Sequence, residues 1–171
     1  LFVSNNTDAN NLILKGNERV LQARLFDAKF FWDKNKKQNL VKQISKLNNI
    51  IFFKKLGSMY DRTQRIRQLS SIIADLVGAN KGDTEIAGSI AKADLVSDLV
   101  GEFPELQGVI GSHFAIQQGF SEEISNAIKE HYLPLSPKDK VPRSKISIAV
   151  ALADKIDTLT SFWSINEKPT G

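Results

Sequence analysis

Cysteine is absent from the 171-residue sequence, and histidine occurs only twice, as His113 and His131. The lack of cysteine excludes disulfide scaffolds, thiol nucleophiles and zinc held by cysteine. Two histidines are too few for a histidine-rich metal site. No apolar run approaches the roughly 20 residues that a bilayer-spanning helix needs. We therefore expect a cytoplasmic protein without a membrane segment.

The first residues, LFVSNN, lack the basic and apolar regions of a signal peptide. They are typical of a strand entered partway, and the end, NEKPTG, lacks a capped helix. We therefore expect an internal piece of a longer protein. The apolar stretches 1–3 and 12–14 flank a turn-forming segment, which predicts a short β-hairpin at the end of a preceding β-containing domain, residues 1–15.

Apolar residues at helical spacing dominate the remaining sequence. Predicted helices cover residues 17–31, 40–51, 58–78, 84–100, 106–120, 121–133 and 144–164. Asn17, Ser58 and Ser121 are suitable first caps, and Gly78 is a suitable end. The last helix should bury its stripe of Ile148, Leu152, Ile156 and Leu159. The sequence therefore predicts an all-α bundle.

Charge is distributed unevenly along the chain. Residues 34–67 hold ten basic residues and a single acid, Asp61, whereas residues 68–171 hold nine basic and fourteen acidic residues. A basic segment on an acidic body is typical of a protein that meets a polyanion.

Six segments point to one family when they are read in order. They are GNERVLQARLFDAKFF (16–31), KLGSMYDRTQRI (55–66), KADLVSDLVGEFPELQGVIG (92–111), EHYLP (130–134), VALADKIDTL (150–159) and PTG (169–171). Together they resemble the beta subunit of bacterial two-subunit glycyl-tRNA synthetase.

The resemblance implies an enzyme of two alpha and two beta subunits that charges tRNA(Gly) with glycine. The alpha subunit would activate glycine with ATP and Mg, and the beta subunit would contribute to tRNA binding. This chain would be a middle section of beta, with no cofactor of its own and no activity alone. Its parts would be residues 1–15, a helical basic connecting segment at 16–57, and a helical domain at 58–171.

The resemblance also implies that residues 58–171 form an HD-type helical domain that has lost its metal. An HD phosphohydrolase holds a divalent metal with a His, a His-Asp pair and a distant Asp. Here Arg62 stands in place of the first His, and Ala93-Asp94 replaces the pair. His131 matches a further His of some relatives, and Asp154 matches the closing Asp. We expect no metal, no catalytic residue, and an ion pair of Arg62 with Asp94 or Asp154.

The basic segment supplies the candidates for tRNA contact. They are Lys34, Lys36, Lys37, Lys42 and Lys46. Interleaved aromatic residues could stack on bases, but burial in the core is favoured for them. Two other functions stay open: a metal-dependent HD-type phosphohydrolase, and a purely structural subunit-interface domain.

Overall fold

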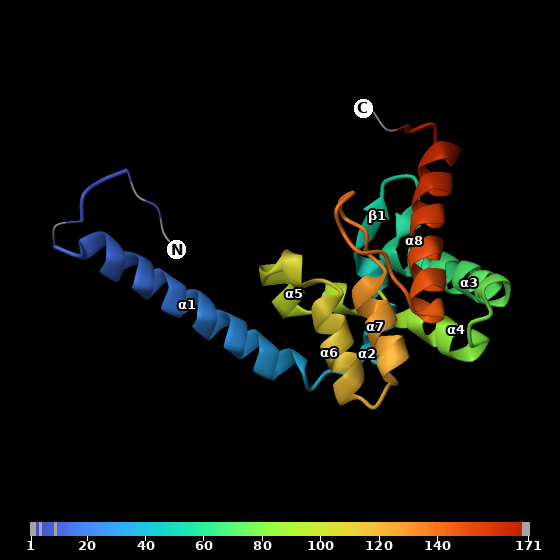
Figure 1. Cartoon of the computed structure of the whole chain (residues 1–171), viewed down its shortest axis with the longest axis horizontal. Coiled ribbons are helices and arrows are strands. Elements are labelled where there is room, and N and C mark those ends of the chain that lie inside the picture. Colours follow the sequence, from blue (N-terminus) through green and yellow to red (C-terminus); the bar gives the residue numbers. More distant parts are fainter. Residues whose placement is uncertain (1–2, 4, 9, 169–171) are drawn as a thin grey trace.

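A computed structural model describes residues 3, 5–8 and 10–168 of the chain, and within these residues the fold is all-α with one small sheet (Figure 1). The helices are α1 (Leu12–Asn35), α2 (Leu40–Gln43), α3 (Met59–Val77), α4 (Lys81–Ile90), α5 (Asp98–Glu102), α6 (Val109–Gln117), α7 (Glu122–Glu130) and α8 (Lys145–Ser164). Three 3₁₀ helices, η1 (Ile44–Asn49), η2 (Ala93–Val96) and η3 (Pro104–Leu106), connect them. The predicted all-α class is confirmed.

Helices α3, α7 and α8 are each capped by a residue that directly precedes the helix. The Ser58 hydroxyl accepts the Asp61 N–H, and the Asp61 carboxylate accepts the Ser58 N–H, which closes a capping box on α3. Gly78 ends that helix with a φ of 67°. Ser121 caps α7 and Ser144 caps α8 with their hydroxyl groups, which accept the N–H groups of Ile124 and Ser147. Local hydrogen bonds therefore set these ends.

The core lies where α3, α4, α7 and α8 pack on one another. Ile66, Ile90, Ile128 and Val150 are among its fully buried side chains. Each such side chain contributes roughly 1.5–3 kcal/mol by leaving water. Leu40 of α2 also belongs to this core, so part of the basic segment is packed against the body.

Helix α1 begins earlier than predicted and projects from the body (Figure 1). Residues 12–14 are helical rather than a strand, because the Asp8 carboxylate accepts the N–H groups of Ile13 and Leu14 at 3.0 and 2.9 Å. Gly16 and Asn17 consequently lie inside the helix. The predicted hairpin at residues 1–15 is therefore wrong in its second strand, while residues 1, 2, 4 and 9 lie outside the described residues.

The hairpin that the described residues do contain lies elsewhere. Strand β1 (Ile51–Phe53) pairs antiparallel with β2 (Gly57–Ser58). The segment 40–51 was expected to be one amphipathic helix. It instead divides into α2 and η1 before β1, and Ile51 is 75% exposed rather than buried.

The helix predicted over residues 84–100 is broken in three. Helix α4 ends at Ile90, η2 follows, and α5 begins after its cap, Ser97. The break turns Asp94 inward, where its carboxylate accepts backbone N–H groups from Gly108 and Gly111. A contact between segments distant in sequence therefore overrides the local helical pattern.

Helix α8 has the predicted bounds but a different buried face. Leu152, Ile156 and Leu159, which were expected in the core, are 42%, 38% and 53% exposed. The buried side holds Ala149, Val150, Ala153, Asp154 and Asp157. Small residues on this side allow α8 to approach its neighbours closely, and the two aspartates meet cations there.

None of the helices in the described ranges is long and apolar enough to cross a membrane. The HD-like character of the bundle and its division at residues 16 and 58 stay predictions.

Candidate functional site

A buried cluster of ionisable residues lies where α3 and α8 pack together. It consists of Arg62 on α3, Asp154 and Asp157 on α8, Lys92 just before η2, and His131 just after α7. All five are at most 9% exposed. Burial of so many charges requires that each be paired or neutralised.

Arg62 is anchored at several points. Its Nη2 atom lies 2.9 Å from Asp154 Oδ1 and donates to Thr158 Oγ1 at 2.7 Å. Its guanidinium lies 4.2 Å from the centre of the Phe52 ring, a cation–π contact. Of the two partners expected for Arg62, the structure therefore selects Asp154. Asp157, 3.6 Å from Arg62 Nε, is held mainly by Arg65 at 2.5 Å.

Lys92 is the member of the cluster that the sequence pattern did not reveal. Its Nζ atom lies 3.0 Å from the same Asp154 oxygen that Arg62 contacts, and 3.8 Å from the centre of the Tyr132 ring. Burial lowers the pKa of Lys92 to about 8. Burial alone would raise the pKa of Asp154, but Lys92 and Arg62 hold it below its usual value. The sequence did contain one signal of this burial, since Lys92 is a single charged residue between the apolar residues 90–91 and 93.

The Asp94 carboxylate accepts hydrogen bonds from backbone N–H groups rather than taking part in the ion pairs. Its Oδ2 atom accepts the Gly108 N–H at 2.6 Å and the Gly111 N–H at 3.0 Å, at the start of α6. Burial raises the pKa of Asp94. A carboxylate at a helix N-terminus satisfies N–H groups that lack helical partners. Asp94 thus joins η2 to α6.

His131 is fully buried. Its Nδ1 lies 2.7 Å from the Ile128 carbonyl oxygen, so Nδ1 carries the proton and donates it. Nε2 has no hydrogen-bond partner among the described residues. Burial lowers the pKa of His131 to about 3, so the ring is neutral at pH 7. His113, by contrast, is exposed.

The arrangement does not fit a divalent metal. Two cations, Arg62 and Lys92, converge on one oxygen of Asp154 and would repel M²⁺. Asp94 directs Oδ2 toward backbone N–H groups instead. In the described part of the chain, no three His, Asp or Glu side chains gather as a metal-binding group. All four predicted positions, Arg62, Asp94, His131 and Asp154, lie within electrostatic range of Lys92.

The five candidate RNA-binding lysines fall into two groups. Lys34 pairs with Asp98 at 2.9 Å, and Lys36 pairs with Asp33 at 2.6 Å. Lys37, Lys42 and Lys46 are exposed and form no ion pair with any described residue. Only the second group presents charges that are free to meet phosphate.

The aromatic residues of the basic segment pack mainly onto the protein. Phe31 and Trp32 lie against the core, and Trp32 contacts Phe114 at a ring distance of 5.4 Å. Phe52 and Phe53 contact Phe162 of α8. Phe30 differs, because 57% of it is exposed. The expected burial is met only in part, because Phe31, Trp32, Phe52 and Phe53 are half-buried and Phe30 is exposed, but their ring contacts still reduce the surface available for base stacking.

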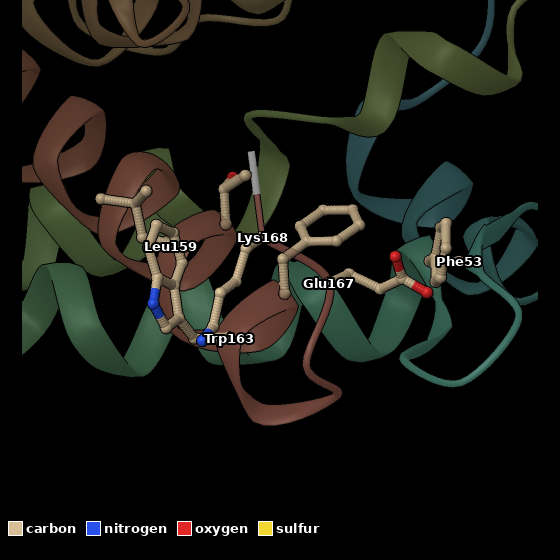
Figure 2. Close-up of a pocket in the computed structure, with 7 residues that line it drawn as sticks. Phe53, Leu159, Trp163, Glu167 and Lys168 are labelled. Atoms are coloured by element: carbon tan, nitrogen blue, oxygen red, sulfur yellow. The ribbon is translucent and has the colours of Figure 1, made fainter. Parts of the chain in front are cut away.

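A hollow of about 320 Å³ lies beside the C-terminal half of α8 (Figure 2). Its wall includes Phe53, Leu159 and Trp163, and Glu167 and Lys168 lie at the same hollow. Thr158 also lines it, but its hydroxyl donates to the Asp154 carbonyl oxygen at 2.7 Å rather than to a base in the hollow. The hollow is an apolar surface feature rather than a catalytic site.

Together, the fold and the cluster define a helical protein domain with a charge-compensated polar core. The whole chain, residues 1–171, matches the family described as Glycyl-tRNA synthetase beta subunit, and the chain belongs to that family. The resemblance seen in the six sequence segments is confirmed.

Three relatives illustrate the similarity, each named a glycine–tRNA ligase beta subunit. The relative from Paracoccus denitrificans is 51% identical over 167 residues, which cover 96% of this chain and 24% of that protein. The one from Neisseria gonorrhoeae is 47% identical over 172 residues, covering 100% and 25%. The one from Phenylobacterium zucineum is 49% identical over 168 residues, covering 96% and 25%. The chain thus spans about a quarter of the length of these relatives.

Proposed function

We propose that the chain is an internal, non-catalytic segment of the beta subunit of glycine–tRNA ligase, which charges tRNA(Gly) with glycine using ATP. Family membership supports the assignment. In this proposal the alpha subunit binds ATP and Mg, and the segment needs no cofactor. The complex works in the cytoplasm, and the segment provides a scaffold and contacts tRNA through phosphates.

The geometry around Asp154 carries the non-catalytic part of the proposal. Arg62 and Lys92 both approach Asp154 Oδ1, at 2.9 and 3.0 Å. Two fixed cationic side chains can balance the carboxylates of α8 as a metal would, but they cannot generate a nucleophilic hydroxide. A metal-dependent phosphohydrolase therefore receives no support from this site.

The exposed lysines support the tRNA contact. Lysine is a flexible point charge, so it suits phosphates better than base edges. Among the five candidates, we assign the larger share of phosphate contact to Lys37, Lys42 and Lys46, because Lys34 and Lys36 are already paired with carboxylates. A purely structural interface domain is the competing function.

The test compares two double variants that remove equal charge from the complete alpha–beta complex. Lys37→Gln with Lys42→Gln should flatten the dependence of log affinity on log salt by roughly 0.7–0.9 for each lysine–phosphate pair that the substitutions remove. The matched control, Lys34→Gln with Lys36→Gln, should change that slope less. Filter binding across a salt series measures the slope for both variants. We expect binding of tRNA(Gly) and of an unrelated tRNA to be affected alike.

Two further readouts separate binding from folding. The free energy of unfolding should change by no more than about 0.5 kcal/mol in either variant, because exposed lysines contribute little. Glycine activation should be retained, since that half-reaction uses no tRNA. An unchanged salt slope together with normal aminoacylation would show that the lysine face is merely solvated, and the structural-interface function would then be preferred.

A further inference from the structure

One side of α8 carries a row of apolar side chains that stay in contact with solvent. We call this row the α8 stripe; it comprises Ile148, Leu152, Ile156, Leu159 and Trp163. Their spacing of three or four residues places them on one face of the helix. Leu152, Leu159 and Trp163 are 42%, 53% and 48% exposed.

Two apolar hollows lie along the α8 stripe. The first, of about 300 Å³, is lined on the α8 side by Ile148, Leu152, Ala151 and Lys155, and on the other side by the segment before α8, at Leu133, Pro134, Val141 and Pro142. The second is the hollow of about 320 Å³ at Leu159 and Trp163 (Figure 2). Ile148 and Leu159 are eleven residues apart, which corresponds to about 16 Å along an α-helix. The surface therefore accepts apolar side chains at two places about three helical turns apart.

The chemistry of the α8 stripe disfavours a nucleic acid as its occupant. At the second hollow, Lys168 is accompanied by the acidic Glu167. The cation within the span of the α8 stripe itself is Lys155, and its Nζ atom donates to the carbonyl oxygens of Leu133 at 2.6 Å and His131 at 3.3 Å. That ammonium is consequently engaged, whereas nucleic-acid affinity depends on cations that reach phosphates. Apolar surfaces of this kind are typical of permanent protein contacts.

The length of the relatives favours a segment of the same polypeptide as the occupant. About three quarters of each relative lies outside the part that this chain matches. A segment of the same polypeptide is tethered, so it reaches a high effective concentration and needs few polar anchors. The last described residues, Glu167 and Lys168, line the second hollow, so the chain leaves α8 beside this surface.

We propose that the α8 stripe and its two hollows form the docking surface for an apolar-faced helix from the part of the same polypeptide that lies outside residues 1–171. The helix would place large apolar side chains about three turns apart into the two hollows. The proposal rests on the family assignment but is independent of tRNA contact, because it concerns a contact within the beta subunit.

Cysteine labelling in the full-length beta subunit, without the alpha subunit, tests the proposal. Residues 1–171 contain no cysteine, so Leu152→Cys and Leu159→Cys introduce single reporters into this part of the chain. The control is Gln68→Cys, at an exposed position of α3. Mass spectrometry of the peptide that carries each new cysteine gives its rate of maleimide labelling. The stripe positions should react roughly tenfold slower than the control in the native protein, and all three should react equally in urea.

Each alternative occupant has its own result. Equal native rates at all three positions would leave the α8 stripe in solvent and overturn the proposal. Protection that appears only after the alpha subunit is added would assign the surface to that partner, and protection that grows with beta-subunit concentration would assign it to a second copy. Circular dichroism verifies the fold of each variant. Trp163→Cys, at the end of the stripe, replaces any reporter that fails to fold.

Discussion

Replacement of Lys92 by methionine should change how stability depends on pH. Lys92 is 2% exposed, and burial lowers its pKa from 10.5 to about 8. The pKa of Lys92 is therefore lower in the folded chain than in the unfolded chain, and between these values the unfolded chain binds more protons. The free energy of unfolding of the wild-type chain must then rise with pH through this window. The methionine variant has no titrating group at residue 92.

The size of the effect follows from the pKa shift. One pKa unit corresponds to 1.36 kcal/mol, so Lys92 should add about 2 kcal/mol between pH 8 and about pH 9.5. The measurement is kept below about pH 10, because unfolded tyrosine ionises there and the raised pKa of the buried Tyr132 makes both proteins less stable as the pH rises further. Lys155, whose pKa burial lowers, is present in both proteins and cancels in the difference. Arg62 continues to pair Asp154 in the variant.

Urea unfolding at several pH values measures the difference. Trp32 packs against Phe114 and provides a fluorescence signal from the core. The free energy of unfolding of wild type minus that of the variant should rise by about 2 kcal/mol across the window. Parallel stability curves for the two proteins would refute the reasoning, because they would mean that Lys92 keeps an ordinary pKa despite its burial.

Three other substitutions test the packing. Arg62→Met should lower the free energy of unfolding by about 2–3 kcal/mol in urea titrations, less than for a fully broken buried pair because a second cation still holds Asp154. Gly88→Ala should cost about 1–3 kcal/mol, because the new Cβ would lie 2.6 Å from Ser70 Oγ; an unchanged melting temperature would contradict this close approach of α3 and α4. Gly16→Ala, with nothing within 4 Å of its Cβ, should instead stabilise α1 by about 0.5–1 kcal/mol, seen as increased helicity.

The helix ends that could be predicted are those governed by neighbours in sequence. Ser58, Gly78 and Ser121 act on groups within one turn of themselves. The same reasoning failed at the start of α1, because the carboxylate of Asp8, in the segment expected to form a hairpin turn, instead accepts the first N–H groups of a helix. It failed again near Asp94, whose hydrogen bonds to residues 108 and 111 depend on how the chain folds back.

The buried cluster shows a similar limit. The sequence offered Asp94 and Asp154 as partners for Arg62, and α3 and α8 had to pack before one could be selected. Lys92 could not be recognised as a second partner, because its pairing with Asp154 joins positions 62 residues apart. Ion pairs between residues so far apart produce no periodic pattern in the sequence from which they could be predicted.

The sequence by itself determined the family, the all-α class and the extent of α3, α7 and α8, because six ordered segments and local capping groups contain that information. Tertiary structure alone decided which side of α8 is buried. Periodicity identifies an apolar stripe at Leu152 and Leu159, but burial also depends on how closely neighbouring helices can approach. The small residues Ala149 and Ala153, together with the ion pair of Asp154, turn the opposite side toward the core.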